Sequence, residues 1–219
     1  MTHYLTCFLV AGAMTVMTTS TATAQGNPEQ GARLVSQGDG SGVPCLVCHG
    51  ADGMGNDAGG FPRLAGLDAG YLAKQMEDYK AGRRTSAIMQ PNVDNFSSQQ
   101  ILDIAAYFSS LPASATQASA DTTDGQLAAG EKLVREGDWD NYIPACSSCH
   151  GPASQGVGSS FPAIAGQHPN YIRQQLTAWK KGERSNDPEQ LMTAVAERLS
   201  DEQITAVAAY LGSLSPDSQ

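Results

Sequence analysis

Two copies of a cysteine–histidine motif constrain this chain more than any other feature of its sequence. In a C-x-x-C-H motif, two thiols three positions apart can each form a thioether to a vinyl group of a porphyrin, and the histidine that follows can bind the iron. The motif is therefore typical of c-type haem attachment. It occurs at two equivalent places, so the sequence predicts two covalently bound haem c groups. The residues that would hold them are Cys45, Cys48 and His49 in the first copy and Cys146, Cys149 and His150 in the second.

Two other uses of paired cysteines fit the sequence less well. A thioredoxin-like C-x-x-C lies in a βαβ context, and no such pattern is visible here. A four-cysteine zinc site has its two arms about 15–20 residues apart, whereas these arms begin at Cys45 and Cys146. Neither alternative requires a histidine directly after the second cysteine in both copies.

The N-terminal residues 1–24 predict a secretory signal peptide that is cut before Gln25. This segment contains no Lys, Arg, Asp or Glu, has an apolar run at 4–17 and ends in Ala-Thr-Ala, a small-residue cleavage site. An uncleaved membrane anchor is the alternative, but the run is short for a bilayer span of about 20 residues. Because c-type haem is attached after export, the protein is expected in the periplasm.

The net charge of −9 lies entirely in the residues that follow this segment. An acidic surface is a poor partner for nucleic acid and a better one for a basic docking face on another protein. The same acidity also serves ordinary solubility. Association with a membrane surface is expected only through partners.

The chain contains one small domain that is repeated. Each half is under about 100 residues, the size of a single small domain. We place domain 1 at 25–111, an exposed linker rich in Ser, Thr and Ala at 112–124, and domain 2 at 125–219. Matching positions include Phe61 and Phe161, Tyr71 and Tyr171, Arg84 and Arg184, and Tyr107 and Tyr210.

Each half is predicted to be all-α, because helix start and stop signals occur without strand-like alternation. Ser97 with Gln100, and Ser200 with Gln203, match the capping box that opens a helix. Asp124 is the expected cap of the first helix in the second half. The expected helices cover 28–35, 71–81, 98–109, 125–135, 171–181 and 201–211.

A methionine is predicted to be the second axial ligand of each iron. Met89 and Met192 occupy matching places, because each follows the repeated arginine and lies eight residues before the serine that caps the last helix. Both lie in polar, loop-like segments, which argues against a purely packing role. Met76 matches Leu176 and is assigned to the core.

Two other potential ligands fit less well. Met54 has no methionine counterpart and lies close in sequence to His49. His168 matches Asp68 in the first half and is expected at the surface or in a loop.

With these residues placed, the chain resembles the dihaem cytochrome c4 family, a tandem of two class I cytochrome c domains. The resemblance covers nearly all of residues 25–215. The motifs that carry it are the two C-x-x-C-H-G sequences, Phe-Pro-x-[Leu/Ile]-Ala-Gly at 61–66 and 161–166, Tyr-Leu-Ala-Lys-Gln-Met at 71–76, Arg-Thr at 84–85, Asn-Phe-Ser at 95–97 and Asp-Ile-Ala-Ala-Tyr-Phe at 103–108.

The resemblance implies two helical domains, each around a covalent haem and related by a pseudo-two-fold axis, with the haems close together at the interface. It implies rapid electron exchange between them and supports the two methionines as ligands. It suggests that the carbonyls of Pro62 and Pro162 accept the outer N–H of the haem histidines. It also suggests that Gly31 and Gly130 permit close helix crossings.

These observations predict an electron carrier rather than an enzyme, because two irons closed by His and Met leave no apparent substrate site. The expected role is a periplasmic shuttle from a quinol–cytochrome c reductase or a dehydrogenase to a haem–copper terminal oxidase. The alternative is a dihaem subunit of an oxidoreductase complex, such as a sulfide-oxidising flavocytochrome. A dihaem enzyme acting on peroxide or another small ligand would need an open iron.

Met89→Ala and Met192→Ala are each expected to open one iron and lower its reduction potential, because thioether ligation favours the ferrous state. The near-infrared spectrum of the oxidised protein and a redox titration measure the effect, with Met76→Ala as the control. The ligand assignment is wrong if neither Met89→Ala nor Met192→Ala changes the spectrum or the potential.

Overall fold

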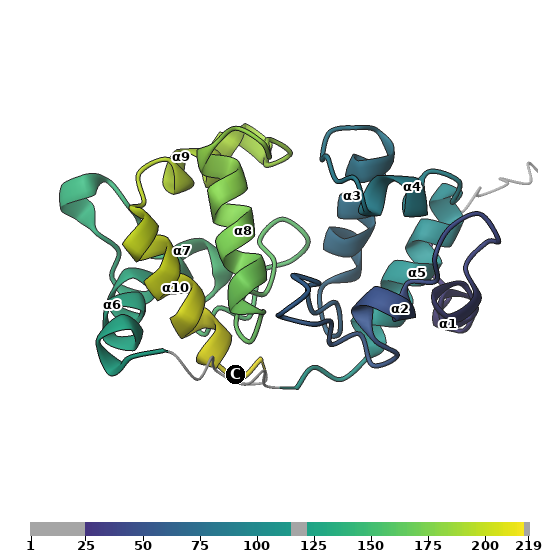
Figure 1. Cartoon of the computed structure of the whole chain (residues 1–219), viewed down its shortest axis with the longest axis horizontal. Helices are drawn as coiled ribbons and strands as arrows, with labels where there is room; N and C mark the ends of the chain where they lie inside the picture. Colours follow the sequence, from purple (N-terminus) through teal and green to yellow (C-terminus); the bar gives the residue numbers. More distant parts are fainter. Residues whose placement is uncertain (1–24, 115–121, 217–219) are drawn as a thin grey trace, which may run out of the picture.

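The computed structural model describes residues 25–114 and 122–216, which form two helical halves lying side by side (Figure 1). Within these residues there is no β-strand, only three isolated antiparallel bridges. The predicted all-α fold with two tandem domains is thereby confirmed, whereas the predicted signal peptide lies outside the described residues. No helix in the described part of the chain is long and apolar enough to cross a membrane.

The two halves repeat the same order of helices. In the first half these are α1 (Pro28–Gln37), α2 (Leu46–His49), α3 (Ala69–Lys80), α4 (Met89–Val93) and α5 (Ser98–Ser110). In the second half they are α6 (Asp124–Arg135), α7 (Ser147–His150), α8 (Pro169–Lys180), α9 (Leu191–Ala196) and α10 (Asp201–Ser213), with two short 3-10 helices, η1 (Trp139–Asn141) and η2 (Pro188–Gln190).

The capping boxes predicted for the last helix of each half are present. Ser97 N donates to Gln100 Oε1 over 2.8 Å at the start of α5, and Ser200 N donates to Gln203 Oε1 over 2.9 Å at the start of α10. In both boxes the glutamine N–H donates back to the serine hydroxyl. Each box therefore satisfies two backbone donors that a helix start otherwise leaves unpaired.

The start of α6 differs from the prediction. Thr123, not Asp124, is the cap, and it forms a capping box with Gln126. The helix therefore begins at Asp124, within the segment predicted to be linker. α3 and α8 begin two residues earlier than predicted, because the Asp68 carboxylate caps α3 and Pro169 supplies the first residue of α8.

Both halves are closed by a pair of helices that cross at a glycine. A Cβ atom on Gly31 of α1 would lie 2.0 Å from the Asp103 carbonyl oxygen in α5. A Cβ atom on Gly130 of α6 would lie 2.2 Å from the Ala206 carbonyl oxygen in α10. The backbones are thus in direct contact, as the sequence resemblance suggested.

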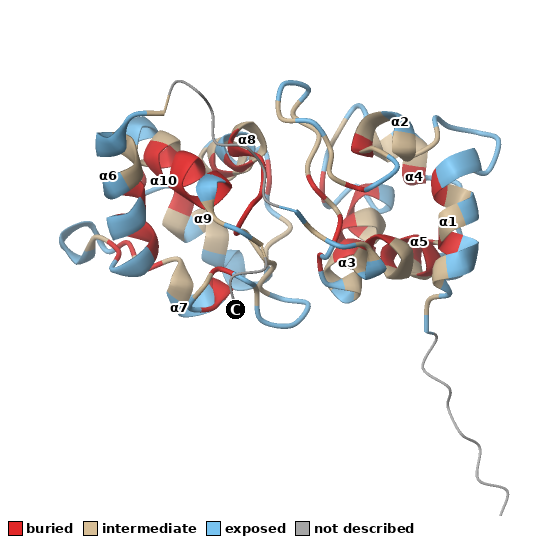
Figure 2. Ribbon diagram, turned by 90° about the horizontal axis from the view of Figure 1, so that it is seen from below, coloured by how far each residue is buried: buried red, intermediate tan, exposed pale blue. Residues whose placement is uncertain are grey.

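Each half has its own hydrophobic cluster, and the last helix supplies much of it. Ile101, Ile104 and Phe108 of α5 are buried in the first half, and Ile204 and Val207 of α10 in the second. Figure 2 shows buried residues along both helices and in the loops between the halves. These loops carry the residues that hold the haem histidines.

Gly130→Ala is expected to destabilise the haem-loaded protein by about 1–3 kcal/mol, the usual cost of forcing atoms into a packed contact. Gly125→Ala in the same helix is the matched control. A Cβ there meets nothing closer than 4.0 Å, so the change should be neutral or stabilising by up to about 1 kcal/mol. Chemical denaturation measures both variants. Equal stability of the two variants would show that the crossing tolerates a methyl group.

Candidate haem sites

The first haem motif lies on a single turn of helix. The backbone N–H groups of Cys48 and His49 donate to the Cys45 carbonyl oxygen over 3.3 and 2.9 Å. Residues three and four positions apart lie on one face of a helix, so both thiols and the imidazole face the same side. His49 is 5% exposed, whereas Val47 between the cysteines is exposed to solvent.

The second motif repeats this geometry on α7. The N–H groups of Cys149 and His150 donate to the Cys146 carbonyl oxygen over 3.2 and 2.9 Å. None of the four motif cysteines forms a disulfide, and burial raises the pKa of the Cys45 and Cys146 thiols to about 11. Zinc binds thiolates, and within the described residues no three Cys, His, Asp or Glu side chains gather into a metal site.

A proline carbonyl holds each haem histidine. His49 Nδ1 lies 3.1 Å from the Pro62 carbonyl oxygen, and His150 Nδ1 lies 2.7 Å from that of Pro162. Burial lowers the pKa of both histidines, which keeps each imidazole neutral with its proton on Nδ1, donated to the carbonyl. Nε2 then carries the lone pair that a metal ligand needs.

Met89 and Met192 lie at the start of α4 and α9, on short helices that the sequence did not predict. The expectation of loop-like surroundings was wrong, because both side chains are partly buried. Met89 packs against the same hydrophobic cluster as Cys45, and Met192 against the same cluster as Cys146. Met76 also packs against the first cluster, as predicted.

The donor set in each half fits a c-type haem. It consists of two thiols for the thioether bonds, a neutral buried imidazole with Nε2 available, and a thioether side chain beside the same apolar cluster. When bound, the haem supplies one-electron iron chemistry. The surrounding protein excludes water and fixes the orientation of the imidazole.

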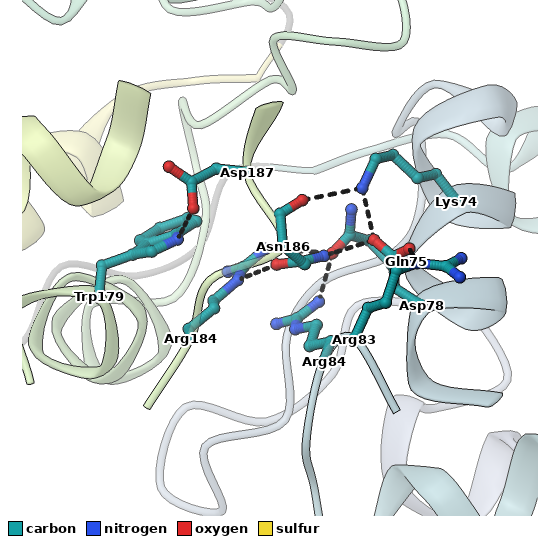
Figure 3. Close-up of polar contacts among 9 residues, drawn as sticks. All are labelled: Lys74, Gln75, Asp78, Arg83, Arg84, Trp179, Arg184, Asn186 and Asp187. Carbon is teal, nitrogen blue, oxygen red and sulfur yellow. Dashed lines mark hydrogen bonds and ion pairs between the residues drawn. The ribbon is translucent and has the colours of Figure 1, made fainter. Parts of the chain in front are cut away.

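A buried polar cluster joins the two halves (Figure 3). Arg84 donates to Gln75 Oε1 over 2.9 Å and to Gln175 Oε1 over 2.7 Å. Arg184 donates to the same two oxygens, over 3.1 and 2.8 Å. Each arginine therefore binds a glutamine from both halves. The repeat of Gln and Arg in the sequence was the signal for this contact, but their partners could not be read from it.

Asp78 extends this cluster along α3. Its carboxylate accepts hydrogen bonds from Lys74, from Arg83 over 2.8 Å and, across the interface, from Asn186 over 2.6 Å. Burial alone would raise the pKa of Asp78, but these three donors outweigh it and hold the pKa below its usual value. The carboxylate is therefore ionised at neutral pH and bonds to both halves.

A single arginine joins the two loops that hold the histidines. Arg63, which follows Pro62 and is 1% exposed, donates from its side chain to the carbonyls of Ala165 and Gly166 over 3.0 and 3.2 Å. Its backbone exchanges two hydrogen bonds of 2.9 Å with the side chain of Gln167. Sequence reasoning missed Arg63. The available signal was a charged residue in an apolar loop whose other copy has Ala163.

His168 is not at the surface as predicted. It is 8% exposed, directly precedes α8 without a capping hydrogen bond from its side chain, and its Nε2 lies 2.7 Å from the Met54 carbonyl oxygen of the other half. Asn170, two residues later, bonds to the Asp57 carboxylate across the same interface. His168 does lie in a loop, the other setting predicted for it, and the packing of one half on the other covers this segment.

Comparison with known proteins identifies the fold and its cofactor. The sequence profile of the family described as Cytochrome c matches residues 28–112 and 127–215. The chain belongs to the cytochrome c family. The structure of reduced recombinant cytochrome c4 from Pseudomonas stutzeri is 38% identical with a TM-score of 0.76, and the match covers 86% of this chain and 99% of that one. This protein is accordingly a dihaem, cytochrome c4-like electron carrier with two covalently bound haem c groups.

Two further relatives carry a more specific name. The thiosulfate dehydrogenase electron acceptor of Stutzerimonas stutzeri is 41% identical over 192 residues, which cover 87% of this chain and 88% of the relative. The structure of thiosulfate dehydrogenase (TsdBA) from Marichromatium purpuratum is 43% identical with a TM-score of 0.80. The match covers 85% of this cytochrome but only 40% of that chain.

Arg63→Ala is expected to loosen the contact between the halves, because it leaves buried carbonyls without donors at about 1–3 kcal/mol each. Calorimetry of the haem-loaded cytochrome should then resolve two unfolding transitions, one for each half. Arg33→Ala, at an exposed position of α1, is the control and should melt as the wild type does. A single unchanged transition for Arg63→Ala would show that Arg63 does not hold the halves together.

Proposed function

We propose that this cytochrome is a periplasmic carrier that accepts electrons from a thiosulfate-oxidising dehydrogenase and passes them toward a haem–copper terminal oxidase. The observation that carries the proposal is the duplicated donor set, a buried neutral histidine held by a proline carbonyl with a methionine at the matching place in each half. The proposed haem ligands are Cys45, Cys48, His49 and Met89 in the first half and Cys146, Cys149, His150 and Met192 in the second.

Closure of both irons supports electron transfer over catalysis. An iron that holds both a histidine and a methionine has no free position for a substrate, and the thioether raises its potential. The protein residues then act by position and exclusion: the proline carbonyls keep the Nδ1 protons in place, and burial keeps water from the imidazoles. Two such sites in one chain can store two electrons.

The relatives support a dehydrogenase as the donor. A protein similar to this one over most of its length is named an electron acceptor of thiosulfate dehydrogenase. A solved thiosulfate dehydrogenase chain contains a matching part as less than half of its length. This favours direct contact between carrier and dehydrogenase, whether the cytochrome acts as a free shuttle or as a subunit.

The predicted N-terminal signal and the haem motifs support the periplasm as the location. The predicted signal peptide at 1–24 has the composition and cleavage site of a secreted precursor. Covalent haem attachment to the two motifs requires the chain to reach the compartment in which c-type haem is attached.

Reduction by thiosulfate tests the proposal. The oxidised holoprotein is mixed with a purified thiosulfate dehydrogenase and thiosulfate, and the ferrous α-band is followed. Both haems should become reduced, and omission of either thiosulfate or the dehydrogenase should abolish the change. If ascorbate reduces the protein fully but the dehydrogenase with thiosulfate does not, the proposed donor is wrong.

Carbon monoxide separates the carrier from an enzyme with an open iron. Carbon monoxide should leave the spectrum of the native reduced protein unchanged, because Met89 and Met192 occupy the sixth coordination site of each iron. A carbon monoxide complex in the wild type would contradict the closed-site assignment.

A further inference from the structure

A well-defined turn in the second half presents two exposed aromatic side chains. Asp138 and Ile143 exchange two backbone hydrogen bonds of 2.8 and 2.9 Å and close the turn around η1. Ile143 is 1% exposed and anchors the turn in the core. Trp139 is 68% exposed and Tyr142 is 79% exposed, so the two largest side chains of the turn point into solvent.

The turn holds Tyr142 in a backbone conformation that this residue type disfavours. Tyr142 has φ 57° and ψ 36°, a left-handed conformation that costs a bulky residue about 1–2 kcal/mol. The Asp138 carboxylate stabilises the turn by accepting from the Asn141 amide over 2.8 Å and from the Gln203 amide of α10 over 3.1 Å. The turn is therefore fixed to the helical body before any partner arrives.

The fold does not require these aromatic residues. The corresponding segment of the first half, at 38–44, reads Gly-Asp-Gly-Ser-Gly-Val-Pro and contains no aromatic residue. This segment directly precedes the first haem motif, just as the turn at 138–143, here called the aromatic turn, precedes the second. Trp and Tyr, together with Arg, are the residues enriched at the energetic centres of protein interfaces.

The charged residues of the aromatic turn itself are all acidic. Residues 136–146 contain Glu136, Asp138 and Asp140 and no Lys or Arg. The nearest cations along the chain are Lys132 and Arg135 on α6, and Arg135 is engaged by Glu131 over 3.0 Å. Such a rim repels nucleic acid, an anionic membrane and a second copy of the same surface, and it attracts a basic protein surface.

The turn is also accessible from outside and close in sequence to the second haem motif. It projects from the outer end of the second half, away from the first half (Figures 1 and 2). Tyr142 is four residues from Cys146, a thiol of the second haem motif, so the two Cα atoms are at most about 14 Å apart.

We propose that Trp139 and Tyr142 form the docking site for a redox protein whose own haem edge is apolar and rimmed by Lys or Arg. The aromatic pair provides the buried centre of the complex, and Glu136, Asp138 and Asp140 steer the basic partner to the second haem. On the proposed function of this cytochrome, that partner is the thiosulfate-oxidising dehydrogenase.

Zinc-substituted mitochondrial cytochrome c, whose haem edge is rimmed by lysines, is a suitable probe because its triplet state is quenched by electron transfer to the oxidised holoprotein. Trp139→Ala should slow quenching at low salt by about tenfold, equal to about 1.4 kcal/mol. Asp140→Asn should weaken the dependence of the rate on ionic strength. Val43→Ala, on the corresponding segment of the first half, is the control and should behave as the wild type does.

Reduction potentials of the variants, measured by redox titration, should equal those of the wild type and so exclude damage to the haem sites. Quenching by Trp139→Ala at the wild-type rate, or equal slowing by Val43→Ala, would overturn the proposed docking site.

The thiosulfate dehydrogenase assay, run on the same variants, identifies the partner. Slower reduction of Trp139→Ala than of the wild type assigns the dehydrogenase to this surface. If the dehydrogenase does not reduce even the wild type, the proposed electron donor is wrong. The quenching experiment still tests the docking site in that case. If the wild type and Trp139→Ala are reduced and quenched equally, the docking site falls and the proposed function stands.

Discussion

Each half of this cytochrome depends on one hydrogen bond, from the buried haem histidine to a proline carbonyl. The bond fixes the Nδ1 proton of His49 or His150 and thereby turns Nε2 toward the metal position. It also ties the C-x-x-C-H turn to the loop that contains Pro62 or Pro162. Because these loops also form the contact between the halves, ligand orientation and domain association share the same backbone.

The interface is symmetric at its centre and asymmetric beside the histidine loops. Arg84 and Arg184 each bind a glutamine of both halves, as expected for a duplicated domain packed on its own copy. The flanking contacts have no such symmetry. The residues involved and their counterparts are Arg63 and Ala163, Leu67 and Gln167, and Asp68 and His168. Two sites with the same ligands therefore have different surroundings.

The surface of the protein consists of an inner interface between the halves and two exposed outer ends. Polar side chains of the inner faces bind each other, and the proposed docking site for a redox partner lies at an outer end. The ends differ in chemistry, since the segment before the first haem motif is rich in glycine and the one before the second carries exposed aromatic residues and carboxylates. A carrier with two unlike ends can receive and deliver electrons at separate places.

The sequence by itself determined the haem chemistry, the duplication and the principal helices, because these depend on local spacing. The C-x-x-C-H motifs and the capping boxes at Ser97 and Ser200 all act within a few residues. The sequence did not reveal the short helices α4 and α9, which lack strong caps. Only the tertiary structure decided the roles of Arg63 and His168, because their partners lie in the other half. Hydrogen bonds between such distant segments arise from packing, which no local pattern records.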